Sequence, residues 1–136
     1  MNRQIYLDSC CLIYLIEEVP ELSSRLKRYL STRIDSILCV SAIVRLEVLV
    51  KPMTNRDEGL IADYEDFIRE QNWLPINDTI VAGALRLRVD HGIKIPDAIH
   101  LATALHYECK EFLTNDDRLG MIAKAVGCVA VNIAEV

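Results

Sequence analysis

Four carboxylates stand among apolar neighbours, where an ionised side chain needs a partner. They are Asp8, Glu47, Asp97 and Asp116, the last with Asp117 beside it. Carboxylates that gather in one place repel one another and cannot all ionise unaided. Mg²⁺ or Mn²⁺ would relieve this repulsion, because hard divalent cations prefer oxygen ligands. These residue types therefore indicate a divalent cation site, provided that the fold brings them to one place.

Each of these acids also has a purely structural interpretation. Asp8 follows a short apolar segment, either as an active-site residue at a strand end or as the N-cap of the next helix. Glu47 shares an apolar helical stripe with Ile43, Leu46 and Val50, or lies at its rim with the carboxylate in water. Asp97 falls in the first turn of a helix, where the helix dipole alone would stabilise it. The sequence leaves both interpretations open.

Short apolar segments alternate with longer helical ones and set the frame for these acids. Strands are predicted at 5–7, 36–40, 73–76, 111–114 and 128–131. Helices are predicted at 10–18, 21–31, 42–50, 54–72, 78–91, 97–107 and 117–126. This alternation predicts an α/β fold of three layers, an α/β/α sandwich with a central parallel sheet. We expect residues 1–136 to form a single domain, with Asp8 and Asp116 at carboxyl ends of strands.

Composition excludes several other classes of protein. The chain has 136 residues, of which 51% are hydrophobic, so it can bury a core without disulfides. Its five cysteines show no metal-binding spacing, and we expect reduced thiols. The five glycines form no phosphate-binding loop. No apolar run approaches the roughly 18 residues of a membrane span, and the N-terminus lacks a signal peptide, so we expect a cytoplasmic protein.

Four segments together resemble the PIN-domain nucleases, most closely the VapC-type toxin ribonucleases. They are IYLDSCCLIYL at 5–15, VSAIVRLE at 40–47, IPDAIHLATAL at 95–105 and FLTNDDRL at 112–119. No segment is specific alone, but all of them occur in order across the chain. The resemblance implies a three-layer fold and an endoribonuclease that hydrolyses RNA phosphodiester bonds with Mg²⁺ or Mn²⁺. It also implies a cognate antitoxin as protein partner and a homodimer.

The resemblance further assigns roles to individual residues. It makes Asp8, Glu47 and Asp97 the first three acids of the family's catalytic and metal-binding set, with Glu47 acting directly or through water. The fourth acid is two residues after Thr114, which selects Asp116 rather than its neighbour Asp117. Ser9 and Thr114 match the hydroxyl positions that support the acids.

For several other residues a structural interpretation is favoured over a role in the site. His100, one turn after Asp97, is more typical of a packed histidine than of a site residue. The basic group Arg25, Lys27, Arg28 and Arg33 fits a solvated helix face better than an RNA contact. The apolar residues of the first two helices exceed one core-facing stripe, which indicates an interface there. They are Leu12, Ile13, Leu15, Ile16, Leu22 and Leu26.

Rival functions are a non-catalytic binding module on the same fold, a PIN nuclease without an antitoxin, and a metal-dependent phosphatase. The phosphatase is the weakest, because Ser9 and Cys10 follow Asp8 where an Asp-x-Asp pair is usual. The net charge of −5 also needs explanation in an RNA-handling protein. Apart from the four acids of the expected site, sixteen acids face fifteen bases, so the acidity is local to one pocket. A bound cation would make that pocket attractive to a phosphate backbone.

Overall fold

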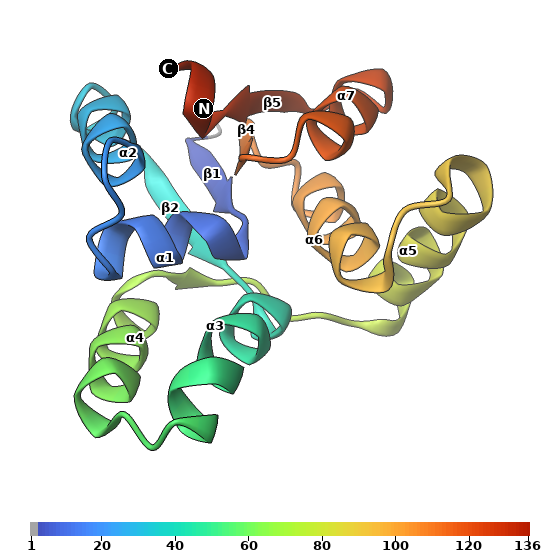
Figure 1. The fold of residues 1–136 in the computed structure, drawn as a ribbon. Helices are drawn as coiled ribbons and strands as arrows, with labels where there is room; N and C mark the ends of the chain where they lie inside the picture. Colours follow the sequence, from blue (N-terminus) through green and yellow to red (C-terminus); the bar gives the residue numbers. More distant parts are fainter. Residues whose placement is uncertain (1–2) are drawn as a thin grey trace.

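The computed structural model describes residues 3–136 and contains a five-stranded parallel sheet (Figure 1). Residues 1–2, which the expected single domain includes, lie outside the described residues. The strands are β1 (Gln4–Leu7), β2 (Ile37–Val40), β3 (Asn72–Trp73), β4 (Glu111–Thr114) and β5 (Val129–Asn132). Each strand overlaps a predicted one, and the α/β class with a parallel sheet is confirmed.

Seven α-helices lie within the described residues and connect these strands. They are α1 (Ser9–Ile16), α2 (Leu22–Ser31), α3 (Ala42–Thr54), α4 (Glu58–Glu70), α5 (Asp78–His91), α6 (Ile95–His106) and α7 (Asp117–Ala125), followed by a 3₁₀ turn at Ile133–Glu135. None of the helices in residues 3–136 is long and apolar enough to cross a membrane.

The strand order is β3-β2-β1-β4-β5. The chain moves outward from β1 to β2 and β3, then crosses back to β4 on the other side of β1. Right-handed crossovers therefore place α1–α4 on one face of the sheet and α5–α7 on the other, as Figure 1 shows. The order reverses between β1 and β4, and ligands bind beyond the carboxyl ends of parallel strands at such a reversal.

The core lies between the sheet and its helices and fixes the neighbours of the site. Tyr6 of β1 and Phe112 of β4 are fully buried and stack with ring centroids 5.5 Å apart. Their backbones are partners in the parallel ladder, as are those of Leu7 and Leu113 one position further on. Asp8 N then donates to the Leu113 carbonyl at 3.1 Å, so the two strand ends are held in register where the acids begin.

Prolines explain two differences from the predicted elements. The predicted strand 73–76 is shorter in the structure, since Pro75 has no N–H for the ladder. The helix predicted at 42–50 continues to Thr54, with Pro52 buried in its last turns. A proline there removes one backbone hydrogen bond, but burial of its ring favours continuation.

The predicted core-facing stripe of α3 is wrong. Leu46 and Val50 are 59% and 58% exposed, whereas Val44, Val48 and Leu49 form the buried side of the helix. Helix α3 is apolar on more than one side, so periodicity alone selects the wrong face.

Packing within the chain accounts for most of the apolar residues on the first two helices, and the interface expected there stays a prediction. Most of its apolar residues face the core: Leu12 and Leu26 are fully buried, and Leu15, Ile16 and Leu22 pack against the core. Within that set, Ile13 alone is exposed, at 36%. The excess of apolar residues is used where α1 packs against both α2 and α3.

Candidate metal centre

Asp8 is buried at the carboxyl end of β1, and its carboxylate is also the N-cap of the next helix. Its Oδ1 accepts from Ser9 N at 2.8 Å, which makes it the N-cap of α1. Its Oδ2 accepts from Thr114 Oγ1 at 2.7 Å, across the strand reversal. Asp8 is 7% exposed, and these bonds fix its carboxylate at the sheet edge. The Thr114 hydroxyl thus contacts the first of the expected acids.

Glu47 projects from α3 toward the histidine of α6. Its Oε1 lies 2.5 Å from His100 Nε2, and the same nitrogen lies 3.3 Å from Asp8 Oδ1. Burial would raise the pKa of Glu47, but the hydrogen bond and charge of His100, with a contribution from the Ser9 hydroxyl, lower it. The carboxyl of Glu47 therefore favours the ionised form that a metal ligand requires. It does so although the buried side of α3 is not the one that the sequence predicts.

Asp97 is the third residue of α6 and half-buried. Its pKa is raised by burial and then by the negative charge of Asp8, partly offset by His100, with Asp116 and Glu47 raising it further. The acids expected at the site are thus close enough to repel Asp97. A cation bound nearby would favour the ionised form of this carboxylate.

The two adjacent acids after β4 have different partners. Asp116 is exposed and is the N-cap of α7, with Oδ1 accepting from Leu119 N at 3.0 Å. Asp117 accepts a hydrogen bond from Asn132 Nδ2 at the end of β5. Asp116, and not Asp117, is among the charges that raise the pKa of Asp97. This difference favours Asp116 as the fourth acid, although its carboxylate also caps a helix.

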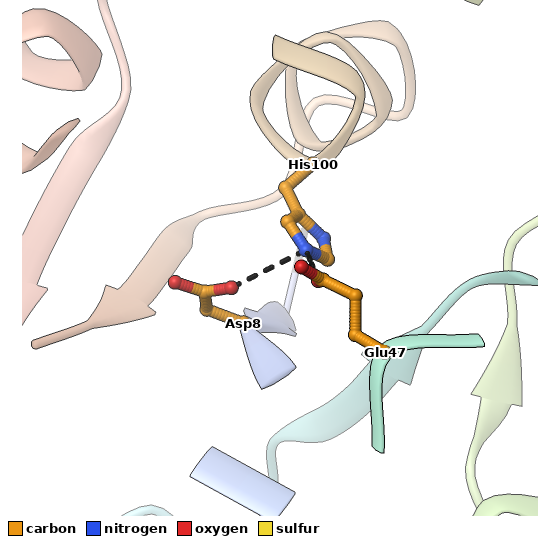
Figure 2. A group of neighbouring side chains, drawn as sticks. All are labelled: Asp8, Glu47 and His100. Carbon is orange, nitrogen blue, oxygen red and sulfur yellow. Dashed lines mark hydrogen bonds and ion pairs between the residues drawn. The ribbon is translucent and has the colours of Figure 1, made fainter. Parts of the chain in front are cut away.

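The side chains of Asp8, Glu47 and His100 converge on one point from β1, α3 and α6 (Figure 2). One ligand atom from each lies within 4.8 Å of the others, so the group could hold a metal ion. Asp97 and Asp116 are not part of this trio, but the charges of Asp8, Glu47 and Asp116 raise the pKa of Asp97. His100 was predicted to pack, and it is fully buried, but its Nε2 faces both acids. Its position one turn after Asp97 was the available signal.

The supporting hydroxyl of Thr114 gives a testable effect. Thr114→Val keeps the side chain's shape but removes the donor to Asp8 and the acceptor for Asp116 N, which lies 3.1 Å from Oγ1. Loss of such an orienting bond is expected to lower any metal-dependent activity about 10- to 100-fold. Initial rates with saturating Mn²⁺ measure this effect. Thr114→Ser retains the hydroxyl and should keep most of the activity, whereas equal losses in both variants would contradict a role for the bond.

The basic group on and just after α2 is largely occupied in contacts within the chain. Arg25 donates to the Ala134 carbonyl, Lys27 pairs with Glu18, and Arg33 pairs with Glu111 while lying over the Tyr29 ring. These contacts favour the structural interpretation of these cations.

The fold and the converging acids define a class of protein. Residues 5–125 match the PIN domain family, and the chain therefore belongs to it. No curated protein sequence matches the chain.

Solved structures with this fold include several toxins. A toxin–antitoxin complex from Klebsiella pneumoniae has a TM-score of 0.74 at 22% identity and covers 95% of this chain and 97% of its own. VapBC2 from Rickettsia felis, bound to a DNA fragment from its promoter, has a TM-score of 0.78 at 15% identity. The match covers 95% of this chain and 98% of the Rickettsia chain. VapC20 from Mycobacterium tuberculosis, a sarcin–ricin loop cleaving toxin, has a TM-score of 0.74 at 14% identity and covers 94% and 98%. These likenesses establish the PIN-like fold.

Proposed function

We propose that this chain is a metal-dependent endoribonuclease that hydrolyses RNA phosphodiester bonds, and that it acts as the toxin of a type II toxin–antitoxin pair. The observation that carries the proposal is the convergence of Asp8 and Glu47 beside Asp97 at the strand reversal of a PIN fold. The structural neighbours of this chain, which include a toxin–antitoxin complex and a sarcin–ricin loop cleaving toxin, support the same proposal.

The residues present fit a divalent cation. Carboxylate oxygens are acceptors only, and the pKa of Asp97 is raised by burial and by the negative charges of the neighbouring acids. Asp8, Asp97 and Asp116 would hold Mg²⁺ or Mn²⁺, with Glu47 acting directly or through water. When bound, the cation would supply Lewis acidity, which lowers the pKa of a water and offsets charge on the phosphoryl oxygens.

The chain's own residues orient this chemistry. Thr114 and Ser9 N hold the two oxygens of Asp8 from opposite sides, so its carboxylate cannot rotate freely. The exposed Asp116 lies on the solvent side, where an extended RNA strand can approach. Asp8 lies at the inner side, where burial limits access of bulk water. Together these positions would align a phosphate between solvent and the sheet edge.

Two other helices offer surface for protein partners. Leu46, Val50 and Met53 form an exposed apolar row on α3, and α5 carries a second row of Val81, Leu85 and Val89. Exposed apolar surface of this kind supports the proposed homodimer and antitoxin contacts.

Incubation of purified protein with single-stranded RNA and Mn²⁺ tests the proposal and separates it from a non-catalytic binding module. The nuclease should produce shorter fragments, and Mn²⁺ should raise the melting temperature by binding the folded state. If the protein neither cleaves the RNA nor is stabilised by Mn²⁺, the binding module is favoured. Cleavage without inhibition by any co-purifying small protein would favour a PIN nuclease that has no antitoxin.

A further inference from the structure

Behind the carboxylates lies a buried hydrogen-bonded chain that the proposed reaction has not used. The Tyr6 hydroxyl lies 2.7 Å from His100 Nδ1 and 2.9 Å from Ser41 Oγ. Tyr6, Ser41 and His100 are all fully buried. The other ring nitrogen, Nε2, points at Glu47 and Asp8 (Figure 2). One face of this imidazole therefore belongs to the core and the other to the acids.

The fold leaves this imidazole little freedom. Tyr6 is stacked on Phe112 at an interplanar angle of 6°, and its ring meets the His100 ring edge to face at 5.7 Å. Ser41 follows β2 directly and precedes α3, the helix that carries Glu47. The phenol, the hydroxyl and the imidazole thus come from adjacent rigid elements, and Nε2 is aimed before any ligand arrives.

We propose that His100 Nε2 is a ligand of the metal ion, that the Tyr6 hydroxyl with Ser41 behind it positions His100 for this role, and that the nitrogen donor makes the site prefer Mn²⁺ to Mg²⁺. This inference rests on the proposed function, since it assumes that the ion binds among these acids. It adds to that function a nitrogen donor, a positioning pair and a metal preference.

The hydrogen-bond chain can serve the ring in either tautomer. Facing Glu47, a carboxylate that only accepts, Nε2 carries the proton, and in a neutral imidazole Nδ1 then accepts from the Tyr6 hydroxyl. For metal binding, Nε2 must offer its lone pair while Nδ1–H donates to Tyr6, whose hydroxyl then donates to Ser41 Oγ. Metal-binding histidines usually have such a partner for the second ring nitrogen. Phenol and serine hydroxyls can reverse direction, so no buried group loses its bond.

The spacing of the donors fits a shared ion. Nε2 and Asp8 Oδ1 are 3.3 Å apart, close to the roughly 3 Å that separates adjacent donors on an ion with bonds of about 2.1 Å. The shorter contact of 2.5 Å between Nε2 and Glu47 Oε1 is a hydrogen bond, and metal binding would replace it. Glu47 would then be the acid freed to act through water.

The donor set determines the metal preference. Mg²⁺ favours oxygen ligands and retains several waters. Mn²⁺ also favours oxygen ligands, but it is the first ion of the transition-metal series whose affinity extends to nitrogen donors. A site of carboxylates alone would discriminate little between the two ions. A carboxylate site with one imidazole should bind Mn²⁺ about tenfold more tightly than the same site without it.

The test uses the full chain with one equivalent of Mn²⁺ and pulsed electron paramagnetic resonance, which detects ¹⁴N coupled to the metal. The wild type should show histidine nitrogen coupling. His100→Gln keeps an amide donor for Glu47 but no imidazole, and it should lose the coupling. Calorimetric titration of the same variant should show about tenfold weaker Mn²⁺ binding and less than about threefold change for Mg²⁺.

Two further variants complete the design. His106→Gln alters an exposed histidine on the same helix and should retain both the coupling and the Mn²⁺ affinity. Tyr6→Phe keeps the stacked ring but removes the hydroxyl, and it should weaken Mn²⁺ binding several-fold without abolishing it. Circular dichroism checks the fold of each variant, and the wild-type spectrum is decisive even if one of them fails to fold.

Mn²⁺ bound to the wild type without ¹⁴N coupling would overturn this inference and leave the proposed nuclease intact. Coupling that persists in His100→Gln would overturn it as well. Absence of any Mn²⁺ binding would overturn both the inference and the proposed function. Equal losses of Mn²⁺ and Mg²⁺ affinity in His100→Gln would contradict the metal preference.

Discussion

Asp8→Asn is expected to reduce RNA cleavage at least about a thousandfold while leaving the protein folded. The substitution replaces one ligand oxygen by an amide nitrogen and removes a charge, and metal-ion stabilisation of a transition state amounts to several kcal/mol. Asparagine is as good an N-cap as aspartate, so α1 should still begin at Ser9. Initial rates with saturating Mn²⁺ measure the loss, and circular dichroism measures the fold.

Asp117→Asn is the matched control for Asp8→Asn. Asp117 is an exposed acid beside the site whose carboxylate contacts Asn132, and its charge is absent from those that raise the pKa of Asp97. We expect this variant to keep activity within about threefold of the wild type, since exposed substitutions have small effects. Retention of more than a tenth of the wild-type activity in Asp8→Asn would show that Asp8 is not a ligand.

Asp97→Asn should have opposite effects on activity and stability. Activity should fall at least about a hundredfold through loss of a metal ligand. The metal-free protein, however, should become more stable at pH 7, because burial and the charge of Asp8 raise the pKa of Asp97 and so penalise its ionised form. The rise in melting temperature should be a few degrees at most, because about 1 kcal/mol corresponds to roughly 3 °C in a chain of this length.

The pH dependence follows from the direction of that pKa shift. A carboxylate whose pKa is raised on folding holds its proton more tightly in the folded state, so its cost to stability is absent below the ordinary value of 3.8. The cost develops as pH rises through the interval above 3.8 and is complete above the raised pKa. In EDTA, the melting temperature of Asp97→Asn should therefore rise relative to that of the wild type as pH increases. A variant that is less stable than the wild type at pH 7 would contradict crowding of the acids.

Much of the frame could be predicted from local patterns. Apolar runs predicted the strands, and the alternation with helices predicted the parallel sheet. The position of Asp8 at a strand end could be predicted because this acid directly follows a short apolar segment. The cap of α7 at Asp116 and the proline near the start of α6 are also local features.

The rest depends on contacts between distant segments, which one sequence does not reveal. His100 contacts Glu47 across 53 positions and Tyr6 across 94, so no local pattern predicts these contacts. In the sequence Tyr6 resembles any aromatic residue of a core, and only the partner of its hydroxyl distinguishes it. The orientation of α3 was misjudged because apolar residues occur on several of its sides, and tertiary packing selected the Val44 and Val48 face.

RNA cleavage by the wild-type chain, followed through removal and return of the metal, tests the central claim most directly. Purified protein is stripped with EDTA, dialysed, and assayed on a labelled single-stranded RNA while Mn²⁺ or Mg²⁺ is titrated back. A metal-dependent nuclease should show no cleavage in EDTA, and its activity should rise to a plateau as either ion is added. The Asp8→Asn variant should be inactive at every metal concentration. Cleavage that continues undiminished in EDTA, or that Asp8→Asn shares, would contradict it.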